Sequence, residues 1–186
     1  MDQFEQMLAM IRHHPFINIT IDDSNASDFT YALPALLDHG LTATFFVVAE
    51  RIDSPGALSS TALQELASSG MRIGTHGLAH RPWRDLRDHG LEAEMRAARI
   101  IAEIAGAPVR EAACPFGSYD RRVLGALRRH GLRRVYTVDR GRAPYGAWLQ
   151  PRYTVCKGDT PADLEQLAYP QHNWHLTART LVKRLR

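Results

Sequence analysis

The chain has 186 residues, of which 45% are hydrophobic and 23% charged, and its formal net charge at pH 7 is +3. This composition is typical of an ordinary globular protein and predicts a single domain over residues 1–186. The small basic excess does not favour nucleic-acid binding, because no run of cations is interleaved with aromatic side chains that could stack on bases.

Hydrophobic periodicity predicts that strands alternate with helices throughout residues 16–167. An amphipathic helix is expected within 1–14, before a buried first strand that begins at Phe16 and ends at the aspartate pair Asp22 and Asp23. Further strands are expected at 42–48, 71–75, 110–114, 133–138 and 148–156, with helices at 27–40, 61–70, 91–105, 120–130 and 160–167. This rhythm predicts parallel pairing, in either an open doubly wound sheet or an incomplete barrel. Residues 168–186 are expected to form a basic tail.

Local signals predict how several helices begin, end and pack. Thr61 to Gln64 resembles a capping box, Asp120 and Thr160 are good helix caps, and Gly106 should close the long helix that begins at Leu91. Two apolar faces are expected to point inward, one made of Phe29, Leu33, Leu36 and Leu37, and the other of Leu91, Met95, Ala98, Ile101 and Ala102.

The amino terminus and the cysteines favour a cytoplasmic protein. Cys114 and Cys156 are too few and too isolated for a disulfide framework. Asp2 and Glu5 stand where a secretory signal would carry basic residues. No apolar stretch reaches the roughly 20 residues that span a bilayer. The sequence therefore predicts no membrane span, and it makes no prediction of oligomeric state.

Chemically reactive side chains follow three of the predicted strands. Asp22 and Asp23 follow the first strand, His76 and His80 the third, and Pro115-Phe116-Gly117 the fourth. Because the carboxyl ends of parallel strands meet at one edge of the sheet, these groups should lie together. Two histidines four residues apart lie on one face of a helical turn, so both imidazoles can bind one metal ion, and an aspartate would complete the site.

Three protein ligands leave coordination positions open, which is typical of catalytic rather than structural zinc. The second aspartate, close to the metal but not bound to it, could act as a general base. Taken singly, a His-x-x-x-His pair or an Asp-Asp pair is most often a surface feature. Their positions at the ends of apolar strands favour a metal site.

Three segments together resemble the first three motifs of the polysaccharide deacetylases, the NodB homology domain of carbohydrate esterase family four. They are Thr20-Ile21-Asp22-Asp23-Ser24, Thr75-His76-Gly77-Leu78-Ala79-His80 and Ala113-Cys114-Pro115-Phe116-Gly117-Ser118-Tyr119-Asp120. The resemblance covers about residues 16–167 and implies a distorted, incomplete (β/α)7 barrel. It also implies that Asp22 is the general base and that Asp23, His76 and His80 hold zinc or a similar divalent ion.

The chain departs from the usual family motifs at several positions. Ser24 replaces a Gly, and Gly77 replaces a Ser or Thr whose hydroxyl commonly orients neighbouring groups. Ala113 stands where many members carry an Arg that holds the catalytic Asp. This third motif resembles that of the poly-N-acetylglucosamine deacetylase-like subgroup, in which a late Leu-Pro-Arg segment resembles the stretch around Arg152 and implies a polar role for Arg152 at the site.

The family's usual motifs for a general acid are not recognisable in this chain. His172 and His175 are the late candidates, although exposed tail histidines are the simpler interpretation. Asp139, at the end of the fifth predicted strand, is expected either to line the site or to form the turn before Gly141.

The resemblance implies a metal-dependent hydrolase that removes an N-acetyl group from an amino sugar in a polysaccharide, oligosaccharide or glycan precursor. Backbone N–H groups near Phe116 and Gly117 would stabilise the oxyanion. Two alternatives stay open: a cytoplasmic deacylase of a nucleotide- or lipid-linked sugar, and a glycan-binding relative with impaired catalysis.

Overall fold

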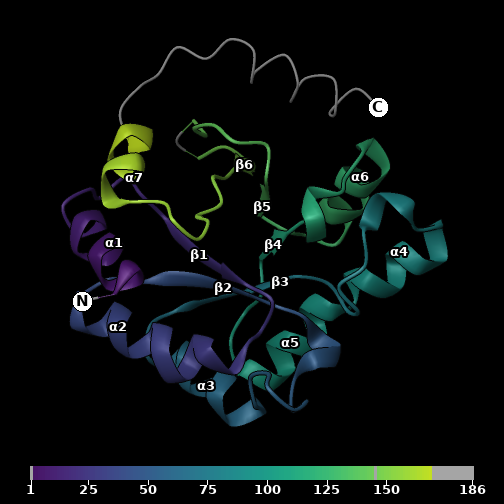
Figure 1. Cartoon of the computed structure of the whole chain (residues 1–186). Helices are drawn as coiled ribbons and strands as arrows, with labels where there is room; N and C mark the ends of the chain where they lie inside the picture. The colour runs from purple at the N-terminus through teal and green to yellow at the C-terminus, as the bar shows by residue number, and fades with distance from the viewer. Residues whose placement is uncertain (1, 145, 169–186) are drawn as a thin grey trace.

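The computed structural model describes residues 2–144 and 146–168, which form one curved sheet of six parallel strands (Figure 1). The strands lie side by side in chain order: β1 (Ile19–Asp22), β2 (Ala43–Val47), β3 (Arg72–Thr75), β4 (Glu111–Ala113), β5 (Arg134–Thr137) and β6 (Leu149–Pro151). A doubly wound sheet requires a reversal of strand order, and this sheet has none. The expected fold, a distorted and incomplete (β/α)7 barrel, is therefore confirmed, with six strands in the described residues.

The helices surround the outside of the sheet (Figure 1). They are α1 (Gln3–Ile11), α2 (Leu33–Asp38), α3 (Ser60–Ser68), α4 (Asp88–Met95), α5 (Ala97–Ala105), α6 (Arg121–Arg129) and α7 (Pro161–Ala168). One hydrophobic cluster joins α2, α3 and α5 to β2 and β3, and a second joins α4 and α6 to β4 and β5. Helix α7 packs beside α1.

The concave side of the sheet holds a small aromatic core. Alternation along β2 directs Phe45 and Val47 into the cluster beneath the helices, while Phe46 packs with Ala113 and Tyr136 in a separate cluster. The ring centroids of Phe46 and Tyr136 are 5.0 Å apart. Gly74, the register partner of Phe46, leaves room for this ring because it has no Cβ.

Gly74→Ala is expected to destabilise the fold by about 1–3 kcal/mol, because a Cβ here overpacks the aromatic core. That Cβ would lie 2.4 Å from Phe46 Cε1 and 3.0 Å from the carbonyl oxygen of Glu111. Gly90→Ala on α4 is the matched control, since its nearest neighbour would be 3.7 Å away. The control should be about 0.4–1 kcal/mol more stable than the wild type. Urea unfolding measures both, and equal midpoints for the two variants would contradict this account.

The first strand differs from its prediction at the amino end. It begins at Ile19, and Phe16 is 82% exposed. The strand is half-buried rather than buried, because β1 is an edge strand that pairs only with β2. The prediction of a buried strand from Phe16 is therefore wrong in both extent and burial.

Two helix starts also differ from their predictions. The helix after Ser27 opens with a π-helical turn, Asp28–Ala32, before α2. The wider turn shifts the phase of the apolar face, so Leu33 and Leu36 are buried while Leu37 is 50% exposed. The cap of α3 is Ser59, whose Oγ accepts a hydrogen bond from the Ala62 N–H, and not the predicted box at Thr61.

The predicted long helix at 91–105 is two helices that meet at Arg96. The chain bends there because α4 packs against α6, whereas α5 packs against α3 and β3. Of the inward-facing residues predicted for this stretch, Ala98 and Ala102 are only half-buried. Gly106 ends α5 in the left-handed conformation, and Asp120 caps α6 by accepting from the Val123 N–H, both as predicted.

The described residues also contain the 3₁₀ turns Ala49–Arg51, Trp83–Asp85 and Pro115–Gly117. The sixth strand is shorter than predicted and ends at Pro151. Thr160 precedes α7 as expected, and its Oγ1 accepts from the Asp163 N–H. No helix in residues 2–144 and 146–168 has the length and apolar character needed to cross a bilayer.

Candidate functional site

The aspartate pair lies at a sharp turn at the carboxyl end of β1. Asp22 is the last residue of the strand, and Asp23 and Ser24 have φ angles of 82° and 60°. Left-handed conformations are costly for non-glycine residues and persist where surrounding contacts hold them. Ser24 is buried, and its Oγ accepts a 2.7 Å hydrogen bond from the Val48 N–H at the end of β2. The hydroxyl thus ties the turn to the neighbouring strand.

Asp28 lies buried behind this turn, where its Oδ2 accepts a hydrogen bond from the Asn25 N–H. Burial, and to a lesser extent the nearby charge of Asp23, raises the pKa of Asp28 to about 7. Asp28 therefore titrates near neutral pH, and its protonated form adds no negative charge beside the aspartate pair.

The segment that carries the two histidines is not helical, so the predicted helical turn is wrong. The chain leaves β3 at Thr75 and turns through Gly77, with φ 89°, and His80, with φ 53°. The two imidazole rings nevertheless lie with their centroids 4.9 Å apart. Backbone turning, rather than the repeat of a helix, brings the histidines together.

Asp23, His76 and His80 form a compact cluster of possible metal ligands. One ligand atom from each residue lies within 4.8 Å of the other two. Asp23 Oδ1 is 3.5 Å from His76 Nε2 and 3.2 Å from His80 Nε2. Zinc ligands lie about 2.0–2.2 Å from the ion, so ligand atoms in a tetrahedral site are about 3.3 Å apart. Both the donor set and its spacing fit a divalent ion such as zinc.

The His76 ring is oriented by the backbone of β4. Its Nδ1–H donates a 2.9 Å hydrogen bond to the carbonyl oxygen of Ala113, which leaves the Nε2 lone pair directed at the cluster. Burial lowers the pKa of His76, which favours the neutral imidazole that a metal requires. A backbone carbonyl behind the imidazole is typical of metal-binding histidines.

Asp22 is held by Arg152, which follows β6. Nη1 and Nη2 of the guanidinium donate to Oδ1 and Oδ2 of Asp22, each at 2.8 Å, and Nη1 also donates to Thr20 Oγ1. Such a bidentate pair fixes the plane of the carboxylate. The guanidinium also lies over the rings of Phe46 and Tyr136, at 5.4 and 5.8 Å from their centroids.

Arg152 contacts Asp22 although the third motif carries no arginine. By the motif resemblance, Ala113 occupies the position of the arginine that holds the catalytic aspartate in many polysaccharide deacetylases. In the folded chain, Arg152 lies just after β6 and reaches Asp22, which is 130 residues earlier in the sequence. Asp22 Oδ2 lies 3.8 Å from His76 Nε2, so the carboxylate borders the cluster.

The Pro115–Gly117 turn lies beside His80. The Gly117 N–H already donates to the carbonyl oxygen of Cys114 within this turn. The Phe116 ring is 65% exposed, and its centroid lies 4.6 Å from that of His80. Of the two predicted oxyanion donors, the Gly117 N–H is therefore engaged within the turn.

The structure does not test the late general-acid candidates, and it shows the surroundings of Asp139. His172 and His175 fall outside the described residues, as does all of the predicted tail except Ala168. Asp139 follows β5 on the same edge as the cluster, where its Oδ2 accepts hydrogen bonds from the hydroxyls of Tyr119 and Thr137.

Glu94, which the sequence patterns did not predict near the site, is only 3% exposed and contacts the histidine segment. A signal was present, because Glu94 lies three residues after Leu91 and immediately before Met95, both buried residues of α4. A charged residue within an apolar helical face requires buried partners.

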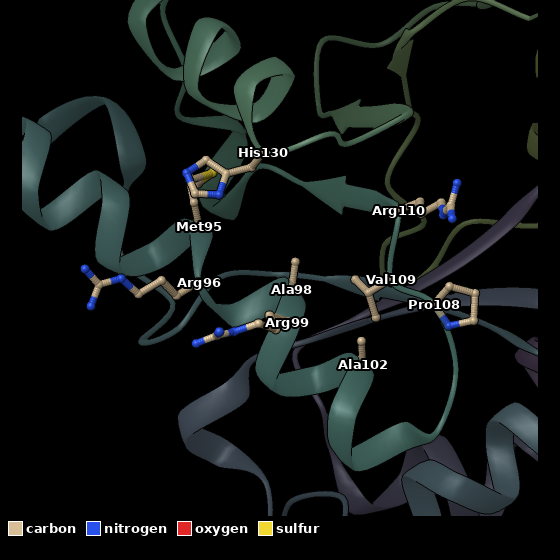
Figure 2. Close-up of a pocket in the computed structure, with 9 residues that line it drawn as sticks. All are labelled: Met95, Arg96, Ala98, Arg99, Ala102, Pro108, Val109, Arg110 and His130. Carbon is tan, nitrogen blue, oxygen red and sulfur yellow. The ribbon is translucent and has the colours of Figure 1, made fainter.

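A hollow of about 570 Å³ lies far from this cluster, at the amino end of β4 (Figure 2). Pro108, Val109 and Arg110 precede that strand and line the hollow together with side chains of α5 and His130. Figure 2 shows Arg96 and Arg99 pointing away from the small apolar residues Ala98 and Ala102. The hollow and the cluster thus occupy opposite ends of the sheet.

The fold is an α/β barrel with parallel strands, and an aspartate and two histidines at the carboxyl ends of its strands form a possible metal site. These two features together define the class of protein. Residues 11–135 match the family model of the polysaccharide deacetylases. That match spans more than half of the chain, which therefore belongs to the polysaccharide deacetylase family.

A named relative is consistent with this family assignment. YxkH of Bacillus subtilis (strain 168), which is named as a polysaccharide deacetylase, is 25% identical over 126 residues, or 67% of this chain and 45% of YxkH. The chain thus spans less than half the length of that relative.

Solved structures show the same fold. The deacetylase PplD of Streptococcus pyogenes, in complex with acetate, superposes with a TM-score of 0.84 at 18% identity, covering 91% of this chain and 87% of PplD. IcaB of Ammonifex degensii superposes with a TM-score of 0.75 at 22% identity, covering 89% and 87%.

Proposed function

We propose that this chain is a divalent-metal-dependent hydrolase that removes the N-acetyl group of an amino sugar within a polysaccharide, oligosaccharide or glycan precursor. The observation that carries the proposal is the Asp23, His76 and His80 cluster bordered by the Asp22–Arg152 pair. Membership of the polysaccharide deacetylase family supplies the class of substrate.

Asp23, His76 and His80 hold the ion in this proposal. A divalent ion such as zinc supplies, when bound there, a Lewis acid that polarises the acetyl carbonyl and makes water more acidic. His76 and Asp23 are oriented before the ion arrives, the first by the Ala113 carbonyl and the second by the turn at Ser24.

Asp22 accepts the proton of the water that attacks the acetyl carbon. Each carboxylate oxygen uses one lone pair toward Arg152 and keeps another for this proton. Arg152 positions the base through its bidentate contact. The Phe116 N–H donates to the oxygen that becomes negative as the tetrahedral intermediate forms.

The Phe116 ring provides an exposed apolar surface at the edge of this site. An aromatic face of this kind suits the apolar side of a sugar ring or the methyl of an acetyl group. PplD was solved in complex with acetate, the small product that deacetylation releases, and this supports the same chemistry here.

The proposal predicts that the purified chain releases acetate from N-acetylglucosamine oligomers in a metal-dependent way. Acetate is measured enzymatically before and after dialysis against a chelator, and again after zinc or cobalt is added back. Release should fall to the uncatalysed background on chelation and return with the ion. Acetate release that survives chelation would contradict metal dependence. Tight oligomer binding without acetate release, at any metal loading, would favour the glycan-binding alternative.

A further inference from the structure

We propose that Glu94 is the positioning residue that holds the segment between His76 and His80 in its metal-binding conformation. This inference rests on the metal site of the proposed function and assigns a role to a side chain outside that site. Three observations support it: the hydrogen bonds of Glu94, the space that Gly77 leaves for its carboxylate, and the left-handed backbone conformation within the segment.

Glu94 is a buried carboxyl group with no cationic partner within the described residues. It lies on α4 and is 3% exposed. The ion pairs formed by residues 2–144 and 146–168 do not include it. Burial of such a group is costly unless hydrogen-bond donors satisfy its oxygens. The donors that do so therefore define its role.

Those donors come from the histidine segment and from the turn that follows it. Glu94 Oε2 accepts from the Leu78 N–H at 2.7 Å and from the Trp83 indole Nε1–H at 3.3 Å. The Ala79 N–H lies 3.3 Å from both Oε1 and Oε2. Glu94 thus binds the backbone of the two residues that immediately precede His80.

Gly77 leaves room for this carboxylate. A Cβ on Gly77 would lie 2.4 Å from Glu94 Oε2 and 3.0 Å from Trp83 Nε1. The Ser or Thr usual at this position in the family would occupy the same space. Gly77 also has a φ of 89°, which glycine adopts readily. The position of the Glu94 carboxylate therefore depends on a glycine at position 77.

The segment needs such a support because it has no helical hydrogen bonds of its own. The carbonyl oxygens of Gly77 and Leu78 accept from the N–H groups of Ala49 and Glu50. Glu94 accepts from the N–H groups of the same segment, so the segment is hydrogen-bonded both to the turn after β2 and to α4. Without the carboxylate, two buried amides lose their acceptor, and His80 is no longer held 3.2 Å from Asp23.

The test compares metal binding by the wild type, Glu94→Leu, Glu94→Gln and Leu91→Ala. Glu94→Leu removes both acceptor oxygens. Glu94→Gln keeps one oxygen, which can occupy the Oε2 position. Leu91→Ala removes a buried side chain of the same helix and so controls for general destabilisation. Zinc affinity is measured by competition with a chromophoric chelator, Co²⁺ coordination by its visible absorption spectrum, and folding by urea titration.

Glu94→Leu should bind zinc about 10–100-fold more weakly, the usual effect of removing a group that orients metal ligands, and should give an altered Co²⁺ spectrum. Glu94→Gln and Leu91→Ala should keep near wild-type affinity and spectrum. If Glu94→Leu does not fold, Gly77→Ala tests the same contact from the side of the histidine segment and should weaken zinc binding.

Two outcomes would overturn the inference, and they can be told apart. Wild-type affinity and spectrum in folded Glu94→Leu, or in Gly77→Ala, would remove the positioning role and leave the proposed function intact. A wild-type chain that binds neither zinc nor Co²⁺ would overturn the proposed metal site and the role of Glu94 together.

Discussion

Asp22→Asn is expected to slow acetate release by about 10²–10⁴-fold, the usual contribution of a general base, while the chain still binds its metal. An amide cannot accept the proton of the attacking water. Asp22 lies outside the Asp23, His76 and His80 cluster, so its replacement removes no proposed ligand. The measurement is kcat on N-acetylglucosamine oligomers alongside metal content per chain.

The control for this variant is Asp38→Asn, which makes the same change of charge at an exposed position at the end of α2. The control should keep wild-type kcat. In the Asp22→Asn variant, the new side-chain amide also turns an N–H group toward the Arg152 guanidinium, so urea unfolding must accompany the kinetics. Full activity of folded Asp22→Asn protein would remove Asp22 from the mechanism.

His80→Ala is expected to abolish stable metal binding and reduce acetate release to the background. Two ligands, Asp23 and His76, would remain, and they do not make a three-ligand site. The loss of affinity should exceed the factor of about 10–100 that follows removal of a group that only orients a ligand. Elemental analysis after mild dialysis should find about one ion per wild-type chain and almost none in the variant.

His89→Ala is the matched control for the histidine experiment. His89 lies exposed on α4, outside the cluster, so its loss should leave the metal content unchanged. This control separates a specific site from weak binding to surface imidazoles. Equal metal content in the wild type and in folded His80→Ala protein would show that these residues do not form a working site.

The amino-acid sequence by itself determined the order of elements, their parallel pairing and the edge at which the reactive groups gather. These features depend on local patterns: apolar periodicity, helix caps such as Asp120, and stop signals such as Gly106. Parallel strands have their carboxyl ends at a common edge, so the meeting of Asp23 with His76 follows once the strands are recognised. The three motifs add the family, because their order and separations are much more specific than any one of them.

The tertiary structure decided the contacts that link distant parts of the chain. Arg152 and Asp22 are 130 residues apart, and only the curl of the sheet brings the end of β6 to the end of β1. The break at Arg96 arises because successive helical segments pack against different neighbours around a curved sheet. Periodicity within a helix carries no information about such a bend.

The histidine segment illustrates the same limit at the site itself. His-x-x-x-His spacing predicted a helical turn, but the segment turns through left-handed residues and is bound by Glu94 from α4. The Gly117 N–H was likewise a plausible oxyanion donor until the turn showed it bound to Cys114. Spacing identifies which residues can meet. Hydrogen bonds from distant elements decide how they meet, because those bonds select one conformation among the several that the local sequence allows.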